Sequence, residues 1–415
     1  MNGNVVGERG YITAISYHCP MKEKILALLG FLPPTPLKKT YKPWKDGTQR
    51  ADNALIVDGR NVKSETDLKA VYNELQEGVK SIKSNGKVLL YSVQPELLED
   101  VHHSTYQRSL EGISRSLAKE LGGRGTSVNL VKLPPNVELP NYKTVEDFFT
   151  SGRSAFITGQ ALVANEAIKS GRELSEKICL VTGGAGGIGS ATVKRLEAEG
   201  ATVIIADIPQ MEERVKTSLS DKISFMGADL TDEGARKQLL EIIKAKHGRI
   251  DVLINNAGIT RDKTLKNMPE HYWDQVVAIN LTAVIALTEE ALEMGLIPDG
   301  GRIIGTSSIS GIAGNFGQTN YTATKAALIG YAASKSKELK MKGITINAIA
   351  PGYIETEMVK TMPLMTRIFA ERLTSLAQAG KPEDIAEAMA FLAHPGAECI
   401  NGQVMRVCGG SFLGA

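Results

Sequence analysis

The sequence is poor in several features, and each shortage excludes a class of protein. Its four cysteines are scattered and form no Cys-x-x-Cys pair, which argues against a disulfide-stapled fold and favours buried thiols in a reducing compartment. No apolar run approaches the roughly 18–20 residues of a membrane helix. The first residues lack the charged, apolar and small-residue segments of a signal peptide. We therefore expect a cytoplasmic protein without a membrane partner.

The excess of positive over negative charge is also small. The net charge is +2, and no basic tract or aromatic–basic interleaving occurs, so no nucleic-acid surface is indicated. No metal site is predicted either, because the adjacent His102 and His103 have no carboxylate or cysteine cluster near them. The length of 415 residues instead favours two or three ordinary globular domains.

What is present centres on residues 308–325. An apolar run ends in hydroxyl residues, the last of them Ser308, as at the carboxyl end of a buried strand. A glycine-rich loop then leads into a helical pattern opening with Tyr321-Thr-Ala-Thr-Lys325. Residues four apart share a helix face, so the Lys325 ammonium would lower the Tyr321 pKa and make the phenol a usable proton donor. Ser308 would hold the carbonyl oxygen; the alternative is a solvated helix face.

A glycine-rich loop follows the apolar strand expected at residues 177–181. It is Thr182-Gly-Gly-Ala-Gly-Gly-Ile-Gly189, followed by a helical pattern and a second strand ending at Asp207. Glycines at a helix start let the backbone approach a pyrophosphate. The Asp207 carboxylate would bind the ribose hydroxyls and repel a 2′-phosphate, so NAD(H) is favoured over NADP(H). Its alternative role is a helix cap or turn residue.

Three further segments fit a nucleotide site. Asp229-Leu230 follows the next strand and is a candidate adenine contact. Residues 251–258 form a strand that breaks into a polar turn, and Asn280 lies in a helical pattern over residues 271–291. Asn280 is either a structural amide or the holder of a water that links Lys325 to solvent. The predicted cofactor-binding residues of the loop and turn are Gly183, Gly187, Ile188, Gly189, Asn256, Ala257 and Gly258.

The N-terminal half repeats the C-terminal half in places. Residues 116–129 align without a gap with residues 334–347. At the same offset His103 aligns with Tyr321 and Gln107 aligns with Lys325. Shorter matches occur in the same order: Lys87-Val-Leu-Leu with Arg302-Ile-Ile-Gly, and Ile157-Thr-Gly-Gln160 with Ile400-Asn-Gly-Gln403. We expect a shortened, catalytically inactive copy, with residues 161–172 as a linker helix. The alternative is that His102 and His103 carry chemistry of their own.

Taken together, these motifs resemble the short-chain dehydrogenase/reductase family over residues 175–415. Within it, residues 258–262, 351–358 and 401–410 look like 3-oxoacyl-thioester reductases, and the N-terminal copy is similar to the high-molecular-weight members, whose extra domain is described as flavodoxin-like. The implied fold is α/β: a Rossmann doubly wound parallel sheet preceded by a smaller degenerate Rossmann or flavodoxin-like domain. The expected domains are residues 1–172 and 173–415.

The resemblance implies NADH-dependent reduction of a 3-oxoacyl thioester, with Ser308, Tyr321, Lys325 and Asn280 catalytic and Tyr321, Lys325, Ile354 and Thr356 also contacting the cofactor. Carrier-protein reductases commonly place two arginines near the site mouth. Asp299 and Lys342 stand there instead, which favours acyl-CoA over acyl-carrier protein. A lid for the acyl chain, or a plain surface helix, is expected around Met362, Met365, Ile368 and Phe369. The alternative functions are an alcohol, polyol or quinone oxidoreductase of the same family, and a scaffold protein whose N-terminal domain binds a partner or forms a dimer. We expect a homodimer.

Overall fold

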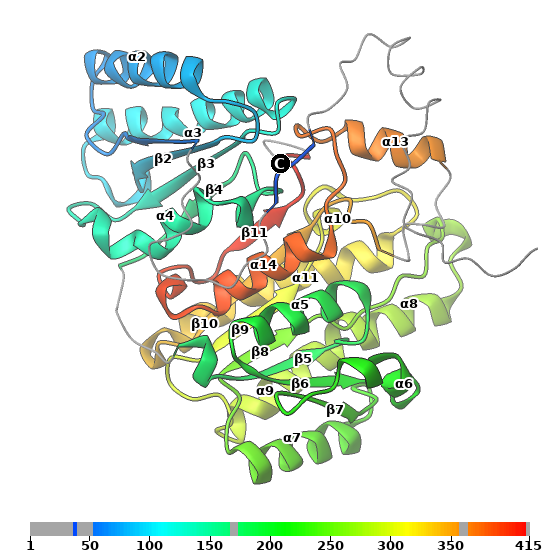
Figure 1. Ribbon diagram of the computed structural model, residues 1–415. Helices are drawn as coiled ribbons and strands as arrows, with labels where there is room; N and C mark the ends of the chain where they lie inside the picture. The colour runs from blue at the N-terminus through cyan, green and yellow to red at the C-terminus, as the bar shows by residue number, and fades with distance from the viewer. Residues whose placement is uncertain (1–35, 40–52, 167–172, 357–363, 412–415) are drawn as a thin grey trace, which may run out of the picture.

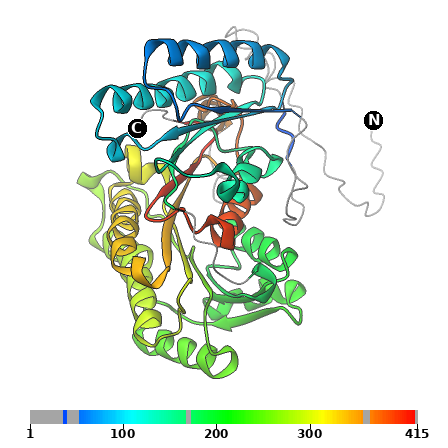
Figure 2. The ribbon, with the colours of Figure 1, turned by 90° about the vertical axis from the view of Figure 1, so that its left-hand side faces the viewer.

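The computed structural model describes residues 36–39, 53–166, 173–356 and 364–411. The described chain forms two parallel sheets, one from each half of the sequence (Figure 1). Turned by 90°, the two halves lie one above the other, and the C-terminal strand and helix run between them (Figure 2).

The larger sheet has seven parallel strands in the order β11-β10-β9-β8-β5-β6-β7. The chain starts in the middle at β5 and winds outward both ways, so the strand order reverses between β5 and β8. Ligands of such sheets bind at this reversal, beyond the carboxyl ends of the strands. The strands are β5 (Ile178–Thr182), β6 (Thr202–Asp207), β7 (Ile223–Gly227), β8 (Val252–Asn255), β9 (Arg302–Thr306), β10 (Thr345–Pro351) and β11 (Val404–Val407).

Helices cover both faces of this sheet, as the apolar strands require. One face packs against α5 (Gly187–Ala198) and α14 (Pro382–Ala393), and the other against α7 (Glu233–His247), α9 (Ala283–Glu293) and α11 (Thr319–Leu339). The remaining α-helices here are α6 (Glu212–Val215), α8 (Glu270–Val277), α10 (Ile309–Ala313) and α13 (Leu364–Arg372), and a π-helical segment, η8 (Ala278–Thr282), joins α8 to α9.

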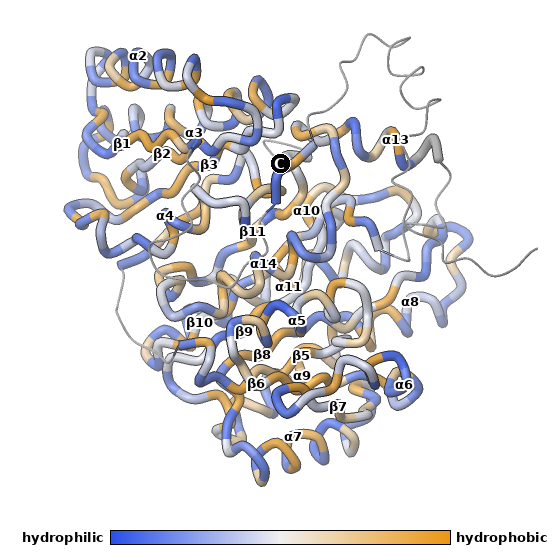
Figure 3. Tube along the Cα trace, in the orientation of Figure 1, coloured by the Kyte–Doolittle hydropathy of each residue, from blue (hydrophilic) through white to orange (hydrophobic). Residues whose placement is uncertain are grey.

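The smaller sheet has the sequential order β1-β2-β3-β4. Its strands are β1 (Ala54–Asp58), β2 (Lys87–Val93), β3 (Ser127–Leu133) and β4 (Ala161–Val163), and its helices are α2 (Glu65–Ser81), α3 (Val101–Gly122) and α4 (Lys143–Phe149). Most residues of the outer helix α2 are hydrophilic, with apolar residues between them (Figure 3). Among the described strands the order never reverses, so this sheet has no crevice of the kind that binds a dinucleotide. β4 also corrects one expectation: residues 161–163 form a strand, and residues 167–172 lie outside the described chain.

Strand register supports the predicted repeat. Lys87 pairs with Ser127 in the small sheet as Arg302 pairs with Thr345 in the large one, in agreement with the sequence alignment. The Asn129 amide donates to the Ile157 carbonyl and accepts from the Gln160 N–H. Asn347 does the same with Ile400 and Gln403. β1–β4 thus correspond to β8–β11, the second half of a doubly wound sheet.

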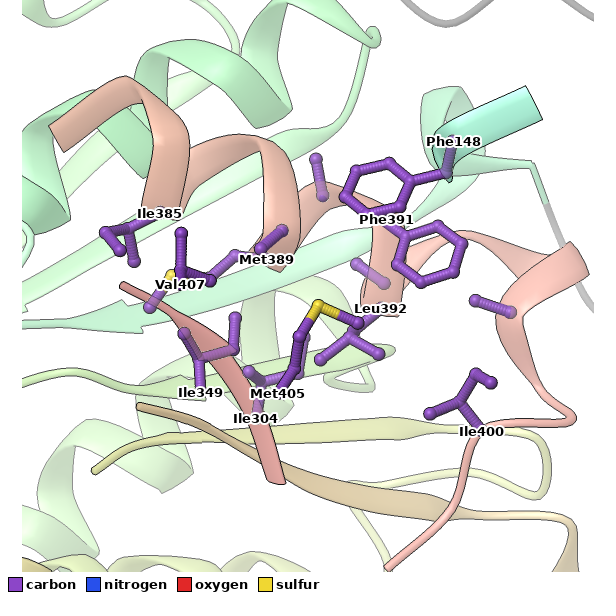
Figure 4. Packing of buried hydrophobic residues seen from close by; sticks show 14 of the residues in the cluster. Phe148, Ile304, Ile349, Ile385, Met389, Phe391, Leu392, Ile400, Met405 and Val407 are labelled. Atoms are coloured by element: carbon purple, nitrogen blue, oxygen red, sulfur yellow. The ribbon is translucent and has the colours of Figure 1, made fainter. Parts of the chain in front are cut away.

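The two halves share one hydrophobic core. The face of the small sheet opposite α2 and α3 continues through α4 into α14, and Phe148 of α4 stacks on Phe391 of α14 with ring centroids 4.0 Å apart (Figure 4). Arg153 enters the same boundary. Its guanidinium binds Glu387 of α14 at 2.6 Å and Glu199 at 3.0 Å, and Arg195 of α5 binds both carboxylates too. Burial of all four side chains ties the N-terminal half to the helix that follows the glycine-rich loop.

Candidate active site

The glycine-rich loop joins β5 to α5 at the strand-order reversal. A Cβ added at Gly189 would lie 2.1 Å from the Gly183 carbonyl oxygen, so only glycine fits there. No described side chain caps the start of α5, whose first N–H groups therefore face the loop without a side-chain acceptor. A helix start of this kind can bind a pyrophosphate, and the loop residues Gly183, Gly187, Ile188 and Gly189 lie at this start.

Asp207 lies at the carboxyl end of β6, beside this loop. One carboxylate oxygen accepts from the Ala185 N–H at 3.1 Å and the other from the Ile208 N–H at 2.9 Å. The side chain is half-buried, and a carboxylate has acceptor sites left after two such bonds. Asp207 can therefore anchor the loop and bind ribose hydroxyls at once.

The polar turn after β8 packs directly on the glycine loop. The Thr182 hydroxyl accepts the N–H groups of Asn256 and Ala257 at 3.0 and 3.1 Å, and the Asn256 amide donates to the Thr182 and Gly183 carbonyls. The turn and the loop thus form one cradle. Asp229 and Leu230 lie beyond β7, where Asp229 accepts from the Thr231 N–H.

Ser308 and Tyr321 meet at the carboxyl end of β9. The Ser308 hydroxyl caps α10 by accepting from the Ser310 N–H at 3.1 Å, and it lies close enough to the Tyr321 phenol to act on its pKa. Burial raises the pKa of Tyr321, the Ser308 hydrogen bond opposes that rise, and Asp262 adds to it. The expected lowering by Lys325 is therefore wrong for this structure: the Nζ lies 5.5 Å from the ring centroid, and burial outweighs it.

Lys325 and Asn280 converge beneath Gly258. The Lys325 Nζ donates to the Thr306 carbonyl at 2.8 Å, and burial lowers the pKa of Lys325 to about 8. A Cβ on Gly258 would lie 3.3 Å from that Nζ and 3.2 Å from the Asn280 Oδ1.

Asn280 is fully buried on η8, and π-helical turns inside α-helices often mark functional sites. Its amide is held at both ends by the Ile259 backbone, accepting from the N–H at 2.8 Å and donating to the carbonyl at 2.9 Å. It also contacts the Thr324 hydroxyl at 3.4 Å, beside Lys325 on α11.

Ile354 and Thr356 follow β10. Ile354 is buried and bridges to Gly380, and a Cβ added at Gly187 would lie 3.5 Å from the Thr356 Cγ2. Thr356 therefore faces the start of α5, while Ile354 packs beside Gly380. The donor set around the reversal fits a nicotinamide dinucleotide: a glycine cradle, an uncapped helix start, a carboxylate and a buried ammonium.

Comparison with known proteins agrees with this geometry. The family model described as enoyl-(acyl carrier protein) reductase matches residues 183–411. The chain belongs to the short-chain dehydrogenase/reductase family. It is 42% identical over 244 residues to 3-oxoacyl-[acyl-carrier-protein] reductase FabG of Thermotoga maritima, which covers 58% of this chain and 99% of that protein. Identity is 40% to the Haemophilus influenzae protein of that name and 38% to the Escherichia coli one, each over 57% of this chain and 98% of the relative.

The short-chain dehydrogenase/reductase family uses a nicotinamide cofactor, which is therefore the class of ligand for the cradle formed by the glycine loop and the polar turn. Residues before 183 lie outside the family model's match. In that half, Gln107 takes the place of Lys325. Its amide donates to the carbonyls of Gly59, Arg60 and Val62, while His103 lies 3.4 Å from the Arg60 carbonyl. The Gln107 amide thus occupies the position aligned with the lysine and hydrogen-bonds only to the backbone among these contacts, which is consistent with an inactive copy.

Sequence reasoning missed a polar group at the mouth. The Gln318 amide donates to Asp262 at 2.9 Å, and its carbonyl accepts from Asn315 at 2.7 Å. Asp262 is exposed and acts on the Tyr321 pKa. Asp262 is the last residue of the matched stretch 258–262, and that was the available signal.

Two expectations about the mouth need correction or lie beyond the described chain. Asp299 and Lys342 stand before β9 and β10, where the Gly300 N–H donates to the Lys342 carbonyl at 2.9 Å. This is the amino-terminal edge of the sheet, about 17 Å of strand away from Ser308, so within one chain they do not flank the mouth. Of the expected lid, Ile368 is buried on α13, Met362 lies outside the described residues, and nothing is described of the Met365 and Phe369 side chains.

One described helical stretch, Glu270–Glu293, is long and apolar enough to cross a membrane by length and composition alone, and 39% of its apolar window is buried. Leu287 and Ala291 belong to the core beneath the sheet, and Asn280 to the site. A core helix of an α/β domain passes the same test.

Proposed function

We propose that the protein reduces a 3-oxoacyl thioester to the 3-hydroxyacyl thioester with NADH, in fatty-acid metabolism. One observation carries the proposal. Two neighbouring hydroxyls, Ser308 and Tyr321, lie with the buried Lys325 at the carboxyl end of β9, one strand from the strand-order reversal of a short-chain dehydrogenase/reductase sheet. The similarity to proteins named 3-oxoacyl-[acyl-carrier-protein] reductase supports the substrate class.

The hydroxyl pair suits a carbonyl oxygen. The Tyr321 phenol donates a proton to the β-carbonyl oxygen, and the Ser308 hydroxyl holds that oxygen in place. Because burial raises the Tyr321 pKa, the phenol is protonated throughout the physiological range. When bound, the reduced nicotinamide supplies the hydride.

Lys325 would bind the nicotinamide ribose and keep a positive charge beneath the phenol. Asn280, held by the Ile259 backbone, would fix a water that returns protons to Lys325. Gly183, Gly187, Ile188 and Gly189 would bind the pyrophosphate. The adenosine and carboxamide ends would contact Asp229 and Leu230 on one side and Asn256, Ala257, Gly258, Ile354 and Thr356 on the other.

NADH is proposed over NADPH because the Asp207 carboxylate would face a 2′-phosphate of the same charge. Replacing it by alanine removes that repulsion and the ribose hydrogen bonds together. We expect Asp207→Ala to raise the KM for NADH about tenfold and to lower the KM for NADPH. An unchanged preference would refute the role of Asp207.

The carrier is proposed as an acyl-carrier protein or CoA. The relatives' names support the former, and the placement of Asp299 and Lys342 away from Ser308 removes the charge argument for CoA within one chain. A direct comparison of acetoacetyl-CoA with acetoacetyl-carrier protein at equal concentration ranks the two.

For the whole chain we propose residues 1–172 as an inactive domain and 173–415 as the catalytic one, in a cytoplasmic homodimer. The incompletely buried apolar stretch Glu270–Glu293 supports a second copy on that face. Light scattering after gel filtration tests the dimer, and a tetramer or monomer would contradict it.

The central experiment follows NADH absorbance with acetoacetyl-CoA, for the native chain and Tyr321→Phe. We expect turnover that the variant loses by about a thousandfold or more, with NADH binding retained by fluorescence titration. Crotonyl-CoA is the control, since reduction of a carbon–carbon double bond needs no proton on oxygen. Turnover of crotonyl-CoA alone would overturn the ketone assignment, and turnover of neither would move the search to alcohols and quinones.

A further inference from the structure

An aromatic side chain of the N-terminal half packs against the catalytic half, next to the loop that follows β10. Phe156 lies in the segment between η3 (Gly152–Ser154) and β4, and it is fully buried in the hydrophobic core that the two halves share. Its backbone carbonyl accepts from the Gly409 N–H at 2.9 Å. The residue aligned with it in the catalytic half is Cys399, so the repeat does not account for an aromatic ring at this position.

Two glycines of the catalytic half contact the Phe156 ring from opposite edges. A Cβ added at Gly380 would lie 2.5 Å from the ring atoms Cδ1 and Cε1, and one added at Gly409 would lie 2.6 Å from Cε2. Real Cβ atoms essentially never come within 3.0 Å of another heavy atom, so the ring leaves room only for glycine at both positions. The ring is therefore fixed in place and in orientation by backbone on either side.

Gly380 in turn pairs with the loop after β10. It forms a parallel bridge to Ile354, its N–H donates to the Tyr353 carbonyl at 2.9 Å, and its carbonyl accepts from the Glu355 N–H at 2.9 Å. A Cβ added at Gly380 would also lie 2.6 Å from the Ile354 Cδ1. The Phe156 ring and the Ile354 side chain thus both occupy the space beside Gly380 where a side chain would otherwise lie.

The same loop, residues 353–356, reaches the cofactor cradle. The Thr356 N–H donates to the Ile354 carbonyl at 2.8 Å, and the Thr356 Cγ2 would lie 3.5 Å from a Cβ added at Gly187, the first residue of α5. Contacts therefore run without a break from Phe156 through Gly380 to the two residues assigned above to the carboxamide end of the cofactor.

We propose that Phe156 is a positioning residue for hydride transfer, which acts through Gly380 and Ile354 to fix loop 353–356 against the nicotinamide. This role rests on the proposed reduction. Hydride transfer depends on the placement of the nicotinamide ring relative to the carbonyl carbon, and a misplacement of about 1 Å can cost roughly a hundredfold in rate. Under this proposal the N-terminal half supplies no reacting group but helps to set the geometry of the reaction.

The variant Phe156→Leu tests the proposal in the full chain. It removes part of the ring that contacts the two glycines but leaves an apolar side chain in the core. We expect kcat at saturating NADH and acetoacetyl-CoA to fall about tenfold, and calorimetric titration to show weaker binding of NADH. Binding of ADP-ribose, which lacks only the nicotinamide, should be unchanged, since the glycine loop and Asp207 would bind the groups that it retains.

Phe148→Leu is the matched control. It makes the same substitution at another fully buried phenylalanine of the N-terminal half, whose ring stacks on Phe391 of α14 rather than beside Gly380. Thermal unfolding should show a similar loss of stability for both variants, whereas only Phe156→Leu should lower kcat and the affinity for NADH. Equal losses of kcat in the two variants would mean general loosening of the core and would overturn the proposal, as would equal weakening of ADP-ribose and NADH by Phe156→Leu.

The binding measurements separate this proposal from the reduction itself. If the native chain binds NADH without turning over acetoacetyl-CoA, the substrate assignment fails, and the comparison of NADH with ADP-ribose still decides the role of Phe156. Unchanged kcat and NADH affinity in Phe156→Leu would refute that role and leave the reduction standing. A native chain that does not bind NADH would refute both.

Discussion

Replacing Lys325 by methionine should stabilise the protein while removing its activity. The fall of the Lys325 pKa from 10.5 to about 8 means that holding the ammonium charged at pH 7 costs roughly 3 kcal/mol of folding free energy. Methionine avoids this cost but loses the hydrogen bond to the Thr306 carbonyl, worth about 1 kcal/mol. A net gain of about 2 kcal/mol at pH 7 is therefore expected.

The sign can be checked by pH. Between pH 8 and 10.5 the folded state holds Lys325 neutral while the unfolded state keeps it charged, so the native protein gains stability as pH rises. At pH 10 the cost falls to roughly 1 kcal/mol, and the advantage of Lys325→Met should disappear. Urea unfolding followed by fluorescence at both pH values measures this.

Lys335→Met is the control. It lies on the same helix, but its pKa is raised by the carboxylates of Glu289 and Glu338 against a desolvation cost, so its loss should destabilise. If Lys325→Met were destabilising at pH 7, or its effect the same at both pH values, the burial argument would be wrong.

Two further predictions follow from buried charges. Arg153→Met leaves the Glu387 and Glu199 carboxylates with Arg195 as their only cationic partner among these four side chains, and it should destabilise the protein by about 3–5 kcal/mol. Thermal unfolding measures the effect, with a substitution at an exposed site, Arg214→Met, as the control. An unchanged Tm would contradict the inference that these ion pairs hold the two halves together. The reductase rate at saturating substrate should fall above pH 8 by up to tenfold per pH unit, because the Lys325 ammonium is lost there; a flat rate to pH 10 would show that its charge is dispensable.

Local patterns gave most of the site in advance. The spacing of Tyr321 and Lys325, the glycines before α5 and the hydroxyls after β9 are short-range features, and the structure brings them together because parallel strands end at one edge. The predicted direction of the Tyr321 pKa shift was wrong because burial by residues distant in sequence raises that pKa, and the charge of Asp262 adds to the rise. The prediction that Asp299 lies near the site mouth was wrong for a related reason. The nine residues from Asp299 to Ser308 include the whole of strand β9, so the two residues lie at opposite edges of the sheet.

The fold shows a similar division between local and long-range information. Alternating strands and helices predict the doubly wound sheet, but three-residue β4 is too short to give a strand pattern, so the sequence predicts a helix there. Its counterpart β11 held the signal, because residues 157–160 align with residues 400–403 just before that strand. The π-helical turn at Asn280 had no sequence marker at all.

At the aligned positions the N-terminal half lacks the proposed catalytic side chains but keeps side chains that pack. Its Asn129 still repeats the backbone contacts of Asn347, whereas Gln107 replaces the lysine and binds backbone carbonyls instead. The same half sends Phe148 and Arg153 into the boundary with α14 and α5. Because α5 begins at the glycine loop, the retained copy is joined through packing and ion pairs to the helix that would receive the pyrophosphate. Its preserved features are those of a structural support for the C-terminal half.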